Sequence, residues 1–246
     1  MISSLFHTFF YDPIYNLLVF LVSVVPHGDV GLAVIGVTIL VRLVLLPFSL
    51  SASRTQRAMK VLEPKLKEIK EQYKDDKQEQ AAKTMELYKT ERVNPFASIV
   101  TLLIQMPVLF ALYFVFLHEP FPQLNAHLLY TATPVPETIS LLFLGIVSVL
   151  GHSIVLAVIA AAAQYYQVIL AVPKPTPKIK GEVLSTQEEF TRMMGLYMRV
   201  IIPVLIGVVA YTTSGAVALY FITGAVVSIL QELYIKRQFD AKPVAL

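Results

Sequence analysis

Residues 31–50 read GLAVIGVTILVRLVLLPFSL, a run of twenty residues in which Arg42 alone carries a full charge. A helix rises about 1.5 Å per residue, so about twenty apolar residues cross a bilayer core of roughly 30 Å. The run therefore predicts a membrane-spanning helix. The whole chain agrees, since 56% of its residues are hydrophobic and 15% are charged, against roughly 25% charged in soluble domains.

Other stretches are apolar over about the length of a span. The clear ones are 95–117, 196–212 and 215–234. Residues 138–172 are nearly all apolar and could form one span or two. The stretch 14–25 has only twelve residues before Pro26, which is too few to cross. We expect it to be a helix in the outer interface, with Asn16 and Ser23 on its polar face.

The distribution of Lys and Arg predicts the topology, because short loops rich in these residues stay cytoplasmic. Residues 51–93 hold eleven of the 20, residues 173–195 hold four and residues 118–172 hold none. The two basic loops then lie on the same side, so an odd number of spans joins 118 to 173. We expect one such span. TISLLFLGIVSVL (138–150) then lies outside as an interfacial or re-entrant piece.

The expected fold is an all-α membrane protein with a five-helix core, its N-terminus outside and its C-terminus in the cytoplasm. Its segments are an external N-terminal segment with the interfacial helix (1–28), the first span (29–51), a cytoplasmic helical hairpin (52–93), the second span (94–118), an external segment (119–151), the third span (152–172), a cytoplasmic loop (173–195), the fourth span (196–213), the fifth span (214–235) and a cytoplasmic tail (236–246).

The cytoplasmic segment 52–93 has a helical pattern of its own. Apolar residues recur at spacings of three and four over 59–73 and over 81–88, with Asp75 and Asp76 between the two runs. These spacings are typical of two short helices packed together. We therefore expect an antiparallel hairpin, whose basic surplus is a solvated face or a contact for anionic headgroups, ribosomal RNA or a partner. Two i,i+4 ion pairs are expected on it, Glu63 with Lys67 and Glu79 with Lys83.

Arg42 is difficult to place in a lipid-facing helix, because a charge at mid-bilayer costs about 2.5–3.5 kcal/mol on insertion scales. It lies eight residues before Leu50, which is about 12 Å of helix. Its side chain reaches roughly half of that distance, so snorkelling to the headgroups falls short. No span carries a carboxylate at this depth, and those nearest to the membrane are Glu119, Glu137 and Glu232.

The spans do carry neutral polar groups. They are Thr38, on the same helix face as Arg42, and Gln105, Gln164, Gln167 and Thr223. A charge with polar neighbours and no counterion is best accommodated by water. We therefore expect a hydrated cavity open to the cytoplasm with Arg42 at its inner end; the alternative is snorkelling with local thinning of the bilayer. A cation in such a pocket attracts a small anion or an acidic stretch of polypeptide.

Four stretches in series resemble the YidC-type membrane protein insertases, a family with mitochondrial and chloroplast relatives. They are GLAVIGVTILVRLVLLP (31–47), LEPKLKEIKEQYKDD (62–76), NPFASIVTLLIQMPVLFALY (94–113) and SGAVALYFITGAVVSILQELYI (214–235). Their order and spacing agree along almost the whole chain. The sequence departs from the family at Phe221, where Trp is usual, and at Ala225, where the family has Asn.

The resemblance implies a five-span core whose spans form a hydrophilic groove, open to the cytoplasm and to lipid. It makes Arg42 the match of the arginine that draws in the acidic or polar tail of a nascent membrane protein. It makes 52–93 the match of the hairpin that recruits substrate. Gln167, and beside it Gln164, match the groove glutamine of the third span.

By the same resemblance, the second and fourth spans guide the hydrophobic segment of the substrate. The residues expected to do so are Met106, Phe110, Tyr113, Met198 and Ile202. The alternative for such aromatic and Met residues is ordinary lipid-facing surface. Gly207 and Gly224 are expected to allow close helix contacts, and one interpretation of Tyr220 is an interfacial anchor.

The sequence thus favours an insertase of the bacterial plasma (inner) membrane that moves short acidic or polar tails through the groove and releases hydrophobic segments into the bilayer. The implied partners are nascent membrane proteins and lipid, with the ribosome and the Sec translocon as further suggestions. The alternative is a small anion channel or carrier that binds its ion at Arg42. An enzyme is not expected, nor a metal, cofactor or specific nucleic acid, because Cys, paired metal-binding His and phosphate-binding glycine loops are missing from the sequence.

Overall fold

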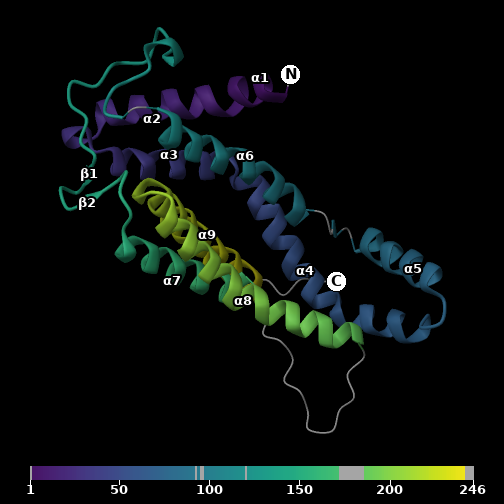
Figure 1. Cartoon of the computed structure of the whole chain (residues 1–246). Coiled ribbons are helices and arrows are strands. Elements are labelled where there is room, and N and C mark those ends of the chain that lie inside the picture. Colours follow the sequence, from purple (N-terminus) through teal and green to yellow (C-terminus); the bar gives the residue numbers. More distant parts are fainter. Residues whose placement is uncertain (1, 92, 95–96, 120, 172–185, 242–246) are drawn as a thin grey trace. The chain divides into compact units, whose positions relative to one another are not determined.

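The computed structural model describes residues 2–91, 93–94, 97–119, 121–171 and 186–241. Most of these residues are helical (Figure 1). Their contacts divide the chain into two compact units. The first unit comprises Met1–Val44 and Met106–Glu232, and the second comprises Leu45–Gln105 and Leu233–Leu246.

The first unit contains most of the helices and a small hairpin of strands. Its elements are α1 (Ile2–Phe6), the π-helical turn η1 (His7–Tyr11), α2 (Asp12–Val24), the 3-10 turn η2 (Pro26–Gly28), α3 (Val30–Val44), the 3-10 turn η3 (Ala126–Leu128), β1 (Leu142–Phe143), β2 (Val147–Ser148), α7 (Ile154–Ala171) and α8 (Thr186–Thr212). The second unit contains α4 (Leu46–Gln72) and α5 (Lys77–Thr90). Two helices contribute residues to both units, α6 (Ala97–His118) and α9 (Gly215–Ala241).

The N-terminal helix is longer than the twelve-residue segment expected over 14–25. Helical structure is continuous from α1 through η1 to α2, and its apolar part, Ser4–Val24, has 21 residues. Pro13 does not interrupt it; the proline lies directly after the π-helical turn η1, and helical structure continues through it. The expectation that this segment is too short to cross a bilayer is therefore wrong; its place at the outer interface stays a prediction.

Asn16 does not form a polar outer face with Ser23, as the sequence had led us to expect. Its side chain is buried. Its Nδ2 donates to the carbonyl of Leu128 at 2.8 Å, and its Oδ1 accepts from the Tyr130 N–H at 2.7 Å and the Thr133 hydroxyl at 2.8 Å. The amide therefore joins α2 to the segment after α6. Several large apolar side chains of this helix are exposed instead: Leu5, Phe9, Phe20 and Val24.

The predicted first span, 29–51, consists of two helical parts. α3 ends at Val44 and α4 begins at Leu46. Pro47 explains the break, since it has no N–H to bond the carbonyl four residues earlier and its ring clashes with that carbonyl. The two parts satisfy the length and hydropathy of a span only when taken together.

Residues 138–150, expected outside as an interfacial or re-entrant piece, contain the antiparallel strands β1 and β2. The chain reverses at Leu144 and Gly145, whose φ angles are 53° and 72°. Gly31 in the first turn of α3 lies directly against this hairpin. A Cβ at Gly31 would lie 2.5 Å from Cδ2 of Phe143, so a residue without a side chain is required there.

α7 and α8 pack along each other, and small residues bring them close. A Cβ at Gly207 would lie 3.0 Å from the Cβ of Ala161, which confirms the close helix contact expected at Gly207. The start of α9 is joined to the segment before α7, because the Gly215 N–H donates to the carbonyl of Gly151 at 2.9 Å.

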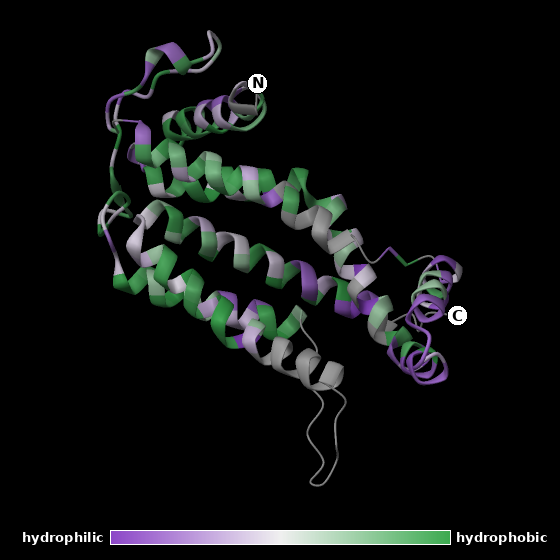
Figure 2. Ribbon diagram, turned by 45° about the vertical axis from the view of Figure 1, so that its right-hand side comes forward, coloured by the Kyte–Doolittle hydropathy of each residue, from purple (hydrophilic) through white to green (hydrophobic). Residues whose placement is uncertain are grey.

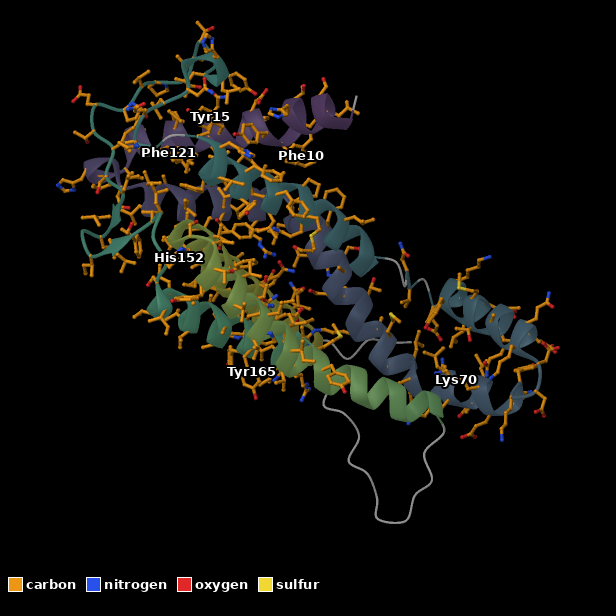
Figure 3. The ribbon with its side chains drawn as sticks, in the orientation of Figure 1. Phe10, Tyr15, Lys70, Phe121, His152 and Tyr165 are labelled. Carbon is orange, nitrogen blue, oxygen red and sulfur yellow. The ribbon has the colours of Figure 1, made fainter. Side chains whose placement is uncertain are left out.

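The core of the first unit is a single cluster of apolar side chains from α2, α3, α6, α7 and α9. Its largest fully buried members include Tyr15, Leu18, Val34, Leu112 and Val115. The ring of Tyr15 lies near that of Phe121, with 6.4 Å between centroids (Figure 3). The Tyr15 hydroxyl also accepts from the Asn125 N–H at 2.8 Å. Aromatic contacts therefore reinforce the attachment of α2 to the segment after α6.

In the second unit, α4 and α5 form the antiparallel pair that the spacing predicts. Lys65 Nζ donates to Glu91 Oε1 at 2.7 Å, and near the turn Gln80 Nε2 donates to the carbonyl of Lys70 at 3.0 Å. The carboxylate of Asp76 begins α5 by accepting from two backbone N–H groups. Figure 2 shows hydrophilic residues gathered on this pair, whereas α2, α3 and α6 are mostly hydrophobic.

The expected i,i+4 ion pairs of this hairpin are present in part. Lys67 lies 4.0 Å from Glu63, as predicted. Lys83 instead donates to Glu86 at 3.0 Å rather than to Glu79, and this hydrogen bond raises the pKa of Lys83 above its usual range. Both pairs are exposed to solvent, so each contributes little to stability.

Among the described residues, three helical stretches are long and apolar enough to cross a membrane, namely Ser4–Val24, Ile154–Ala171 and Gly215–Gln238, and the pair α3–α4 makes a fourth if it is one broken span. The five-span count and its orientation stay predictions. α8 begins ten residues before the predicted span, so 186–195 are helix rather than loop. α9 continues beyond the end of the predicted fifth span at residue 235, as far as Ala241, so this part of the predicted tail is also helical. Residues 172–185 and 242–246 of the predicted loop and tail lie outside the described residues.

Candidate functional site

Arg42 lies in the last turn of α3, two residues before the helix ends. The final carbonyls of a helix carry partial negative charge, which favours a cation there. The next two side chains, Leu43 and Val44, are 55% and 73% exposed. Arg42 itself is half-buried. The local sequence therefore places a single cation at a helix end on an otherwise apolar surface.

The guanidinium of Arg42 extends from α3 to the surface of α9. A Cβ built on Gly224 would lie 2.9 Å from Nη2 of Arg42, 3.6 Å from Nε and 3.7 Å from Cζ. The planar group therefore rests against the backbone of α9 where a side chain is missing. Tyr220, one turn earlier on α9, is buried and interacts electrostatically with the same guanidinium.

The charge of Arg42 lacks an acidic partner within the part of the chain that the structure describes. Its Nε is buried and has no hydrogen-bond partner among those residues. Leaving a buried donor of a charged group unpaired costs more than about 1–3 kcal/mol. Such an arrangement is expected where water or an anionic ligand meets the charge during function.

The polar residues predicted around Arg42 are placed in different ways. Thr38 is buried, and its hydroxyl donates to the carbonyl of Val34 at 2.7 Å, so it is satisfied by its own helix. Thr223 is buried next to Gly224 on α9. The predicted glutamines are all half-buried: Gln164 and Gln167 on α7, and Gln105 in the second unit.

Gly224 and Tyr220 are the neighbours of Arg42 that sequence reasoning did not assign to the site. The structure does not show the close contact between helices that was expected at Gly224, because the space beside this glycine holds the charged side chain of Arg42. The interpretation of Tyr220 as an interfacial anchor is wrong, because the residue is only 5% exposed. A small residue and a tyrosine one turn apart were the available signal, but their spacing does not reveal which helix they face.

The residues predicted to guide a hydrophobic segment lie on α6 and α8. Met106 and Phe110, one turn apart on α6, are 40% and 48% exposed. Tyr113 is half-buried, with its ring 5.4 Å from that of Phe114. On α8, Met198 is 39% exposed and Ile202 is half-buried. Exposure of this kind fits either a lipid-facing surface or a path for an apolar substrate.

The opposite end of α3 is fixed by Asp29, which the sequence analysis did not single out. Its carboxylate is buried. Oδ1 accepts from the N–H groups of Gly31 at 2.8 Å and Leu32 at 3.1 Å, and Oδ2 accepts from the Leu144 N–H at 2.7 Å. An Asp directly before an apolar run is a helix-start signal that could have revealed the first two bonds.

A buried polar contact also joins the N-terminal helix to the end of α6. The Tyr11 hydroxyl donates to Oε1 of Glu119 at 2.5 Å. The other carboxylate oxygen of Glu119 is buried without a hydrogen-bond partner among the described residues. From its place in the sequence, Glu119 is expected only as a carboxylate near the edge of the membrane.

Comparison with known proteins finds one family over nearly all of the chain. The family described as 60Kd inner membrane protein matches residues 20–242. The matched region includes α3 with Arg42, the α4–α5 hairpin and α9 with Gly224.

Curated relatives named membrane protein insertase YidC align with the chain. The relative from Fusobacterium nucleatum is 28% identical over 234 residues, which are 94% of this chain and 98% of that protein. The relative from Clostridium tetani is 29% identical over 212 residues, 86% of this chain and 84% of that protein. A third, from Cellvibrio japonicus, is 47% identical over 100 residues, 38% of this chain and 18% of that protein.

Proposed function

Because the chain belongs to the 60Kd inner membrane protein family, whose matched relatives are named membrane protein insertases, we propose that it inserts proteins into a membrane and receives its substrates at Arg42. One observation carries the proposal. The Arg42 guanidinium is half-buried on an apolar surface, has no acidic partner among the described residues and has a buried, unpaired Nε.

The charge of Arg42 fits a substrate that brings its own carboxylate. A short acidic or polar tail enters a hydrated groove from the cytoplasm and is held briefly by the guanidinium. Charge-assisted hydrogen bonds of this kind contribute about 1.5–3 kcal/mol. Water in the groove shortens the apolar distance that the tail must cross, because polar groups are costly only in the hydrocarbon itself.

The remaining polar side chains of the proposed groove assist this step. They are Thr38, Gln105, Gln164, Gln167 and Thr223. Uncharged amides and hydroxyls hold water and the polar backbone of an extended tail without trapping it, because they form weaker bonds than charged groups.

The hydrophobic segment of the substrate leaves sideways into the bilayer. Its transfer releases roughly 25 cal/mol per Å² of apolar surface, which drives the step without nucleotide hydrolysis. The side chains that guide it are Met106, Phe110, Tyr113, Met198 and Ile202. Flexible Met and flat aromatic side chains suit this role, since they adapt to segments of different shape.

The proposed topology has five spans, with the N-terminus outside and the C-terminus in the cytoplasm of a bacterium. The α4–α5 hairpin then lies in the cytoplasm, where its basic surface meets nascent chains. The ribosome and the Sec translocon are the further partners in this arrangement.

Reconstitution in liposomes tests the role of Arg42. The substrate is a single-span protein with a short acidic tail, and insertion is measured by protection of the tail from external protease. Arg42→Ala is expected to lower the insertion rate by about tenfold or more, because a charge-assisted bond is lost. Arg42→Lys is expected to retain most of the activity.

Arg237→Ala is the matched control, because Arg237 is an exposed arginine near the end of α9, outside the hairpin, and its loss changes the net charge equally. It is expected to insert the substrate at the normal rate. Full insertion by Arg42→Ala would contradict the proposed role of the charge. Flux of small anions without insertion of protein would show a channel or carrier instead.

A further inference from the structure

Gly224 provides the surface on which the Arg42 guanidinium rests. The ideal Cβ position at Gly224 is 2.9 Å from Nη2, closer than Cβ atoms in proteins approach other atoms. Nε and Cζ lie 3.6 and 3.7 Å from the same point. The side chain of Arg42 therefore occupies space that any residue other than glycine would fill.

The contact fixes where the charge lies, because little else holds it among the described residues. Nε has no hydrogen-bond partner there, and no carboxylate draws the group to one side. An arginine side chain has several rotatable bonds, so it would otherwise take up many positions. The backbone of α9 at Gly224 restricts these positions.

We infer that Gly224 is a positioning residue for the substrate-binding charge: the absence of a side chain at this point of α9 sets the location of the Arg42 guanidinium. The inference rests on the proposed function only for its effect on insertion. The contact itself can be tested without any substrate.

A thiol at position 224 tests the contact directly. The chain has no Cys, so Gly224→Cys introduces a single thiol. Nη2 is the free end of a flexible side chain, so the guanidinium is expected to shift enough to admit the Cβ and to stay beside the thiol. A neighbouring cation lowers the pKa of a thiol, and one unit is about a tenfold increase in thiolate below the pKa. The Gly224→Cys protein in liposomes is treated with a neutral methanethiosulfonate reagent. We expect it to react about tenfold faster than the same protein carrying Arg42→Gln.

Equal reaction rates in the two proteins would overturn the inference, whatever the insertion assay shows. Arg54→Gln in the Gly224→Cys protein is the matched control for net charge. It is expected to leave the rate unchanged, since Arg54 is exposed to solvent, where its charge is screened.

The effect on function is tested by adding one methyl group. Gly224→Ala is expected to displace the guanidinium and to slow insertion of an acidic-tailed substrate, while a neutral-tailed substrate inserts at the normal rate. Gly36→Ala is the matched control, because its Cβ would lie at the same 2.9 Å from a flexible side-chain end, Cδ1 of Leu21. Thermal unfolding of both variants reports whether either one is misfolded.

A double variant separates positioning from a merely structural role. If Gly224 acts through Arg42, Gly224→Ala has no further effect on insertion in a protein that already carries Arg42→Ala. An equal loss in both backgrounds, or equal slowing of acidic and neutral tails, would overturn the inference. Normal insertion in Arg42→Ala together with a fast thiol reaction would leave the contact established and refute the proposed function alone.

Discussion

The buried polar side chains of the first unit serve two different purposes. Asn16, Asp29 and Thr38 bond to backbone groups at distances between 2.7 and 3.1 Å, so their polarity stabilises the fold. Arg42 differs, since its buried Nε has no partner among the described residues. A satisfied group can be removed only at the expense of stability. An unsatisfied charge costs stability while it is present, which fits the binding role proposed for Arg42.

Asn16→Ala is expected to destabilise the protein by about 1–3 kcal/mol, because it leaves partly buried backbone groups of Leu128 and Tyr130 without their partner. Thermal unfolding in detergent measures this as a lower midpoint temperature. Ser23→Ala on the same helix is the control, since the Ser23 hydroxyl bonds only to the carbonyl of Phe20 within α2. An unchanged midpoint for Asn16→Ala would contradict the anchoring role.

At the scale of elements, the two ends of α3 are set by different means. Asp29 begins the helix and also bonds to the turn between β1 and β2, so one carboxylate joins two elements. Pro47 prevents the helix from continuing into α4. Arg42 therefore lies at a helix end rather than in the middle of a continuous span, and the helix dipole supports its charge.

Two aspartates that begin helices are expected to differ in their response to amidation. Asp76 accepts both of its backbone hydrogen bonds through Oδ1. Asp76→Asn is therefore expected to change the free energy of unfolding by less than about 0.5 kcal/mol, because Asn caps helices equally well.

Asp29→Asn is expected to cost about 1–3 kcal/mol. Both oxygens of Asp29 accept hydrogen bonds, and an amide would direct N–H groups toward one of those donors. Thermal unfolding of the two variants side by side checks the difference. Equal stability of the two would show that the bond to the Leu144 N–H contributes nothing.

The sequence predicted those elements whose signal is local. The spacing of apolar residues in 59–73 and 81–88 predicts α4 and α5, and Asp76 lies at the turn between them. What it missed depends on partners far along the chain. Asn16 bonds to a residue 112 positions later, and Asp29 bonds to one 115 positions later. Periodicity carries no information about such pairs, so a buried amide was interpreted as a polar surface.

The same limit applies to the candidate site. Arg42 could be singled out because its chemistry conflicts with its apolar neighbours. Gly224 could not, because a glycine gains meaning only from the atoms that face it, and these belong to a helix 182 positions earlier. The polar residues expected around Arg42 were identified from their polarity, their helix face and the family resemblance. Thr38 shows that a polar residue in an apolar helix can be satisfied by its own backbone.

At the scale of the whole molecule, the proposed topology moves negative charge across the membrane toward the outside. A membrane potential positive outside then assists by about 2.3 kcal/mol per charge per 100 mV. In proteoliposomes, collapse of a 100 mV potential is expected to lower insertion of a singly acidic tail by up to about 40-fold. A neutral tail is the control and should be unaffected. An equal response of both tails would contradict charge-driven transfer.

The bonds of Asn16 have a consequence for biosynthesis. A ribosome adds about 5–20 residues per second, so Leu128 emerges roughly 6–22 s after Asn16. During that interval the Asn16 amide has none of its bonds to the segment after α6. The helix can reach its final position only after that segment lies on the same side of the membrane as Asn16. A helix that is made early therefore takes its final position late, and until then the new chain resembles an incompletely inserted substrate of an insertase.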